Sequence, residues 1–158
     1  GSSKTIKTPN GNVTVDSNGG KIQIKDKNGS VSVGGGSVPE DFPKSDVPLP
    51  SISSKDIVTA GSSTIGGKKT WSIIYKSGGS SAAKDYINKL KDAGYSEGDS
   101  TSTGGYSSSS LSKGKYTVSV IGASASSGNT LTVAVRPSET SDTTTSDTSA
   151  SDTSNSGL

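Results

Sequence analysis

Cysteine, histidine and methionine are absent from this 158-residue sequence. Without cysteine the chain has no disulfide framework and no thiolate metal site. Without histidine it lacks the commonest general base and the commonest metal ligand. These absences count against most enzyme and metal chemistry, and we expect no bound cofactor and no metal.

Apolar residues are scarce as well. Hydrophobic residues make up 26% and aromatic residues 4% of the chain, whereas Ser and Thr make up about a third. A chain of this composition cannot bury a core along its whole length, so parts of it must be repetitive, extended or disordered. No run approaches the ~18–20 apolar residues that a membrane-spanning helix needs.

The net charge of +2 is the sum of two segments of opposite charge. Four acidic residues and no basic one follow Ser138, so residues 1–138 carry about +6 and the remainder about −4. The basic part could be attracted to an anionic cell-wall polymer or a membrane surface by weak, screened electrostatics. The alternative is ordinary solvated lysine, and we expect no specific binding of nucleic acid.

Residues 1–37 contain a glycine-punctuated repeat of nine residues. Each unit places a pair of turn-forming residues before a short alternating segment; the pairs are Asn10-Gly11, Gly19-Gly20 and Asn28-Gly29. The alternation predicts half-buried strands, and these pairs favour hairpin turns with positive φ. An antiparallel meander and a small solenoid both fit, and so short an array favours the meander. Each strand carries only two aliphatic residues on one face, so the array must pack against something else.

Residues 38–54 form a proline-rich segment. Its four prolines disfavour helix and interior strand and favour an extended backbone. The apolar residues between them predict a strap packed along a surface; they are Val38, Phe42, Val47 and Leu49.

Residues 55–137 are the expected folded core. Alternation predicts strands over 56–60, 70–76, 116–121 and 130–135. Apolar residues spaced three or four apart predict a helix that is capped by Ser80 or Ser81 and ends at Gly94. Residues 95–114 are ambiguous, with a weak strand near 106–111. These elements predict an α+β fold in which one helix packs on an antiparallel sheet.

The last segment, residues 138–158, consists mostly of Ser, Thr and Asp. Such a segment buries too little apolar surface to offset its ordering entropy, and we expect it to be disordered.

Two short motifs are candidates for chemistry. Ser81 and Lys84 match S-x-x-K, in which a lysine activates a serine nucleophile. A capping serine followed by a solvated lysine explains the same residues, and the companion motifs are missing. The segment 61–70 resembles a phosphate-binding loop, but Gly67 stands where lysine is required and a strand pattern follows, so a hairpin is favoured.

Trp71 and Tyr75 are the weak surface-binding candidates. Their rings could stack on a sugar, although on an alternating strand such residues more often belong to the core.

The proline-rich segment, the central Trp71 and the helix end Ala93-Gly94-Tyr95 together resemble secreted cell-envelope lipoproteins of Gram-positive, particularly actinobacterial, bacteria. The resemblance covers about residues 38–136, and the group has no established activity. It implies an extracellular protein attached to the outer face of the cell membrane through an N-terminal lipid absent from this chain. The missing Met and the Gly/Ser-rich start lead us to expect a mature chain that begins just after a lipidated cysteine.

We therefore expect a non-catalytic, exported cell-envelope module with a binding or structural role and an unknown ligand, as a monomer or weak oligomer. The alternative is a small hydrolase that uses Ser81 and Lys84.

Overall fold

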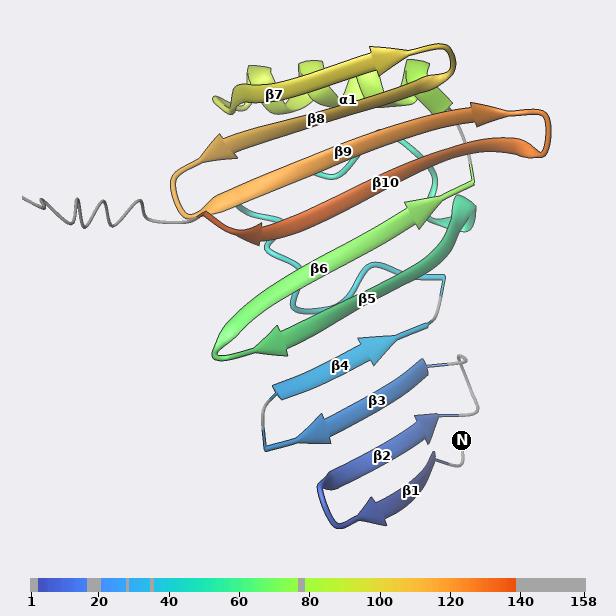
Figure 1. The fold of residues 1–158 in the computed structure, drawn as a ribbon, viewed down its shortest axis with the longest axis vertical. Helices are drawn as coiled ribbons and strands as arrows, with labels where there is room; N and C mark the ends of the chain where they lie inside the picture. Colours follow the sequence, from blue (N-terminus) through green and yellow to red (C-terminus); the bar gives the residue numbers. More distant parts are fainter. Residues whose placement is uncertain (1–2, 17–20, 28, 35, 77–78, 139–158) are drawn as a thin grey trace, which may run out of the picture.

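A computed structural model describes residues 3–16, 21–27, 29–34, 36–76 and 79–138 (Figure 1). Its ten strands form one antiparallel sheet in the order β1-β2-β3-β4-β5-β6-β10-β9-β8-β7. The strands are β1 (Ser3–Thr8), β2 (Gly11–Asp16), β3 (Lys21–Asp26), β4 (Gly29–Val33), β5 (Ile57–Ile65), β6 (Lys68–Tyr75), β7 (Ser96–Thr103), β8 (Tyr106–Lys113), β9 (Tyr116–Ala125) and β10 (Gly128–Pro137). A 14-residue helix, α1 (Gly79–Asp92), and a short 3-10 turn (Ser54–Asp56) complete the described elements.

The expected antiparallel sheet with one packed helix is present, but the α+β class is a correction, because the fold is mostly β. The ambiguous residues 95–114 form two further strands, β7 and β8. All eight residues of β7 are exposed and none is aliphatic or aromatic, so the strand has no alternation that its sequence could display. Its pairing with β8 decides its conformation instead.

The repeat forms a meander, and the solenoid alternative is wrong. β1 to β4 pair consecutively, and β4 pairs in turn with β5, so the repeat and the core share one sheet. The first turn differs from the expected one. Pro9 and Asn10 form the connection between β1 and β2, and Asn10 does not have positive φ. In both Asn-Gly pairs the glycine is the first residue of a strand, Gly11 in β2 and Gly29 in β4.

Glycines of the repeat permit close approach between strands. A Cβ atom at Gly11 would collide with the carbonyl oxygen of Lys25, and one at Gly29 would collide with that of Thr64. Any larger residue there would push neighbouring backbones apart. The glycines thus favour strand pairing as well as turns.

One face of the sheet is covered by α1 and by the proline-rich strap. In register across the central strands, Val120, Val133 and Ile73 point to this covered face and are fully buried. The helix packs over β8, β9 and β10. The core therefore lies between this face and its covering layer.

The strap is bonded to the elements it covers. Tyr86 Oη donates to the carbonyl of Pro48 at 2.9 Å, and Tyr95 Oη donates to the carbonyl of Asp46 at 2.8 Å. Val47 is fully buried between these anchors. The expectation of a strap packed along a surface is confirmed.

The two ends of α1 differ in how well the sequence predicts them. Gly94 has φ +98° and ends the helix, with the Tyr95 amide donating to Leu90 O and the Gly94 amide to Lys91 O, as in a Schellman motif. The predicted cap at the start of the helix is wrong for Ser81, because this residue lies inside the first turn. The amide of Ser80 donates to the Ser124 hydroxyl of β9 at 3.3 Å.

The segment that resembles a phosphate-binding loop is a hairpin, as expected. Gly66 and Gly67 join β5 to β6 with φ of +58° and +77°, and no helix follows. The sequence predicts disorder for the segment 138–158, but Ser138 is ordered, since its amide donates to the Lys115 carbonyl at 2.8 Å. Residues 139–158 lie outside the described residues.

Candidate functional site

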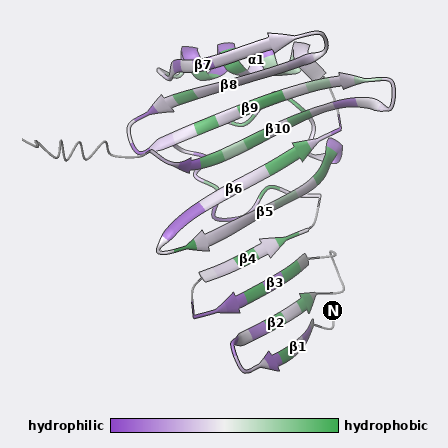
Figure 2. Cartoon of the chain, in the orientation of Figure 1, coloured by the Kyte–Doolittle hydropathy of each residue, from purple (hydrophilic) through white to green (hydrophobic). Residues whose placement is uncertain are grey.

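The face opposite α1 and the strap, here called the open face, carries two aliphatic rows on β1 to β4. Register places Ile6, Val13, Ile24 and Val31 in one row and Val15, Ile22 and Val33 in the other. We call these seven residues the aliphatic ridge. Figure 2 shows them interspersed with polar residues along each strand. Two examples show how open the ridge is: Ile22 is 43% and Val33 is 49% exposed.

Both rows change from aliphatic residues to small or hydroxyl-bearing residues between β4 and β5. Beyond Val33 the register continues through Gly61, Ser72, Ala134 and Ser119. Beyond Val31 the next positions are Ser63 and Thr70; Thr70 Oγ1 donates to the Ser63 carbonyl at 3.4 Å. The open face therefore passes from an aliphatic surface to one of small and hydroxyl-bearing residues.

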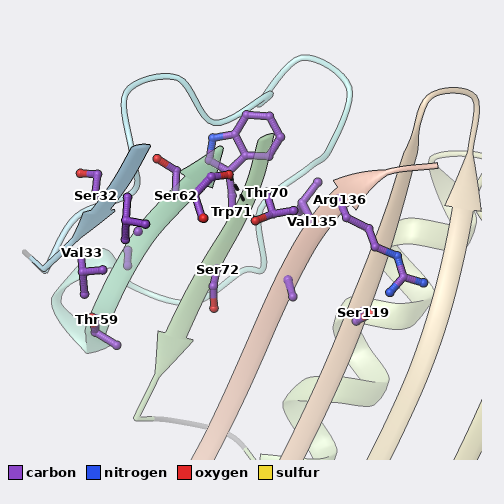
Figure 3. A pocket seen from close by; sticks show the side chains of 15 residues that line it. Ser32, Val33, Thr59, Ser62, Thr70, Trp71, Ser72, Ser119, Val135 and Arg136 are labelled. Carbon is purple, nitrogen blue, oxygen red and sulfur yellow. Dashed lines mark hydrogen bonds between the residues drawn. The ribbon is translucent and has the colours of Figure 1, made fainter. Parts of the chain in front are cut away.

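A hollow of about 390 Å³ lies at this change (Figure 3). Val31 and Val33 line it from the ridge, Ser72 lines it from β6, and Arg136 lines it from β10. Trp71 and Ser72, adjacent on β6, point to opposite sides of the sheet in Figure 3. Most residues that line the hollow lie on the open face by register, and Trp71 of the covered face also borders it. Its chemistry suits an apolar contact rather than catalysis, because it presents methyl groups, hydroxyls and a single cation.

The charges that register places on the open face are mainly positive. Lys4, Lys68 and Arg136 lie on it and make no ion pair within the part of the chain described. Asp26 occupies an open-face position at the end of β3, and its carboxylate accepts a bond from the Gly29 amide at 2.9 Å. Lys68 and Arg136 lie on the neighbouring strands β6 and β10, whereas Lys4 lies on the distant strand β1, so only two of the three cations are close together.

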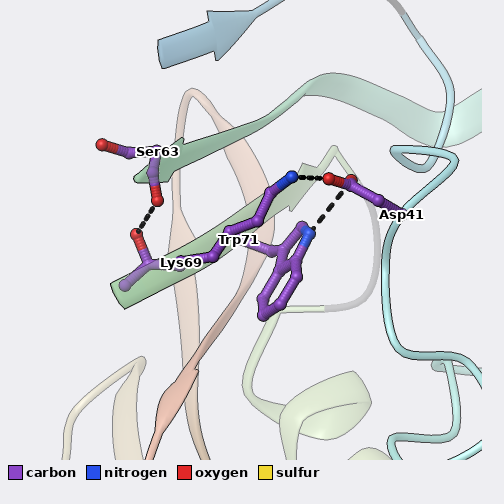
Figure 4. A network of polar contacts seen from close by, with 5 residues as sticks. Asp41, Ser63, Lys69 and Trp71 are labelled. Carbon is purple, nitrogen blue, oxygen red and sulfur yellow. Dashed lines mark hydrogen bonds and ion pairs between the residues drawn. The ribbon is translucent and has the colours of Figure 1, made fainter. Parts of the chain in front are cut away.

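Trp71 and Tyr75 lie in the core on the covered face, with 8% and 2% of their surface exposed. Neither ring is available to stack on a sugar in this arrangement. Trp71 Nε1 donates to Asp41 Oδ1 at 3.1 Å, and Lys69 forms an ion pair with the same carboxylate (Figure 4). The edge of the indole packs against Phe42 with ring centroids 6.3 Å apart. Trp71 thus secures the strap.

Ser81 and Lys84 line a groove of about 420 Å³ between α1 and strands β7 and β8. Both residues are exposed, and neither makes a hydrogen bond or ion pair with another described residue. A lysine that acts as a base needs apolar walls around it, and an exposed position on a helix does not supply them. The groove brings the two residues to one surface without the surroundings of a nucleophile and its base.

The same groove holds a polar network that the sequence did not predict. Glu97 pairs with Lys91 and accepts a hydrogen bond from Ser109 Oγ at 2.9 Å. The bonds from Lys91 and Ser109, in that order, lower the pKa of Glu97 below its usual range. The hydroxyl of Ser107 is buried nearby without a partner. Only the pairing of β7 with β8 brings these residues beside α1.

Known proteins offer no template for this arrangement. The chain matches no protein-family model, no curated protein and no solved structure. Among the described residues, no helix is long and apolar enough to cross a membrane. The same residues include no cluster of three or more acidic side chains suited to a metal ion. The open face, with its exposed aliphatic ridge and the hollow beside it, is the candidate functional surface.

Proposed function

We propose that this protein is a non-catalytic, exported module of a bacterial cell envelope with a binding or structural role, and that it acts through the open face of its sheet. The observation that carries the proposal is the uncovered aliphatic ridge. In a sheet-based domain, the apolar face is normally buried against a second layer. Contiguous exposed apolar surface on a soluble protein commonly marks an interaction site.

A binding role agrees better with the surface chemistry than a catalytic role does. The hollow beside the ridge presents methyl groups and hydroxyls, with Arg136 as its cation. Ser81 and Lys84 are both exposed, so nothing around them would activate a nucleophile. The hydrolase alternative has no geometric observation in its favour.

The location in the envelope is supported by the strap. Its prolines and apolar residues are the part of the chain that resembles the lipoproteins of Gram-positive bacteria, and the structure gives those residues a packing role. In this proposal an N-terminal lipid holds the module on the outer face of the membrane. Exposed lysines spread over the body add a weak, screened attraction to anionic polymers or lipid headgroups.

The test is localisation of the natural gene product in its own host. Intact cells are treated with an external protease and then fractionated, and the protein is followed with an antibody. We expect it in the envelope fraction and degraded by the external protease. A protein that stays protected and cytosolic would refute the proposal.

Catalysis is tested separately with serine-reactive acylating probes and mass measurement. We expect no adduct. A stoichiometric adduct on Ser81 that disappears in Lys84→Ala would replace the proposal with the hydrolase.

A further inference from the structure

We propose that the open face is the interface of a symmetric dimer, in which the aliphatic ridge of each copy packs into the hollow of the other. This inference rests on the proposed function in that it names the partner of the same face. The occupant of the open face is then a second copy of the chain.

The ridge has no cover within the part of the chain that the structure describes. Among the described elements, β1 to β4 have their substantial contacts only with neighbouring strands, and α1 and the strap lie on the other face. From Glu139 onward the sequence contains Ala150 and Leu158 as its only aliphatic residues, too few to supply a second layer. A second copy of the chain can supply the missing cover.

The face is complementary to itself. Suppose that a two-fold axis lies parallel to the strands between β4 and β5. It sets β4 opposite the β5 of the second copy, β3 opposite β6, and β2 opposite β10. Along one row, Val33, Ile22 and Val15 then lie over the positions of Gly61, Ser72 and Ala134 in the second copy. The same contacts occur twice, as an isologous interface requires.

The charges on the open face permit this arrangement. About that axis, Lys68 of β6 lies opposite β3 of the second copy, and Arg136 of β10 lies opposite β2. Lys4 of β1 lies opposite β9 of the second copy. No two cations are superposed: Lys68 lies opposite Asp26 of the second copy, and Arg136 and Lys4 face uncharged positions. The arrangement thus avoids the repulsion of like charges at close range.

The available area predicts a weak dimer. Strands about 4.8 Å apart, each about five residues long with a rise of about 3.3 Å, give the eight strands that face each other about this axis, from β1 to β9 in the sheet order, a projected area of about 630 Å². Two copies would bury about 1,300 Å², near the lower end for a specific interface. We therefore expect association that depends on protein concentration.

Sedimentation velocity and light scattering from micromolar to millimolar concentration test the inference. The wild-type protein should pass from monomer to dimer. Ile22→Lys on the ridge and Ser72→Asp in the hollow should each raise the dimer dissociation constant about 100-fold or more, because the interface would bury an unpaired charge. Gln23→Lys is the matched control, since it is the next residue on β3 and faces the other side. Circular dichroism checks that each variant is folded.

The decisive experiment mixes the Ile22→Lys variant with the Ser72→Asp variant. The lysine at position 22 of one chain would then face the aspartate at position 72 of the other, so the mixture should form a heterodimer. Recovery of the dimer would exclude unfolding as the reason for its loss. A dimer that survives both substitutions, or a mixture that stays monomeric, overturns the inference.

Other outcomes separate this inference from the proposed function. A protein that is monomeric at every concentration but exposed on the cell surface refutes the dimer alone. A dimer in a cytosolic protein refutes the envelope role alone. Phosphatidylglycerol vesicles test the competing occupant: binding by a monomer that Ser72→Asp abolishes would assign the open face to a membrane and overturn the dimer.

Discussion

Replacing Asp41 with alanine should loosen the strap, and the size of the effect can be worked out from its contacts. The carboxylate accepts the indole N–H of Trp71 at 3.1 Å and forms an ion pair with Lys69. The indole is 8% exposed, so its N–H loses its acceptor in a largely buried position. A buried donor without a partner costs about 1–3 kcal/mol. The ion pair adds less than about 1 kcal/mol, because its two side chains are 37% and 46% exposed and therefore screened.

A double-mutant cycle isolates the hydrogen bond. Trp71→Phe removes the donor and part of a buried ring, so it has its own packing cost. In that background Asp41→Ala should cost only the ion pair, about 0–1 kcal/mol. We therefore expect a coupling free energy of about 1–3 kcal/mol between the two positions. Lys69→Ala serves as the control for the ion pair and should change stability by less than about 1 kcal/mol.

The assay is urea unfolding of the four proteins of the cycle. Far-ultraviolet circular dichroism is the appropriate probe, because Trp71 is the only tryptophan of the chain. The slopes of the four transitions should agree, so that differences in midpoint report stability. If Asp41→Ala costs the same with tryptophan and with phenylalanine at position 71, the hydrogen bond does not secure the strap.

Three further predictions concern the helix and its groove. Ser124→Ala removes the cap at the start of α1 and should lower the free energy of unfolding by about 0.5–2 kcal/mol in urea titrations; an unchanged midpoint would contradict the cap. Gly122→Ala would place a Cβ atom 2.7 Å from that of Ala83 in the helix, so thermal unfolding should show a loss of about 1–3 kcal/mol, whereas wild-type stability would argue against this packing. Because the pKa of Glu97 is lowered in the folded state, its carboxylate contributes stability that is present near neutral pH and is lost as the pH falls through the folded pKa. In an NMR titration, the pKa of Glu97 should rise toward the usual glutamate range in Lys91→Ala. Equal titration midpoints in the wild type and the variant would show that Lys91 does not lower this pKa.

Local pattern in the sequence was enough to predict several elements. Alternation marked the strands around Val13, Ile73 and Val133, because side chains in a strand point to opposite faces in turn. The spacing of Ala83, Tyr86 and Leu90 marked one face of a helix. Gly94 marked the end of that helix, since few other residues accept positive φ. Each prediction depends on residues that are neighbours in the chain.

Features that depend on distant residues could not be predicted in this way. The cap of α1 comes from Ser124, whose hydroxyl accepts a hydrogen bond from an amide 44 residues earlier in the chain. The eight exposed residues of β7 form a strand only because β8 lies beside them. The burial of Trp71 involves the distant strap, whose Phe42 packs against its ring.

The sequence by itself determined that the repeat forms strands with an apolar face, because alternation with a period of two is a property of the local chain. It also determined that this face needs a cover, since two aliphatic residues per strand cannot make a core. Only the tertiary structure decided where the ridge ends and the hollow begins. That boundary arises where Val33 meets Gly61 across the strands β4 and β5, which are separated in the chain by the whole strap. Register between strands so far apart is set by the packing of the sheet as a whole, because no local pattern specifies it.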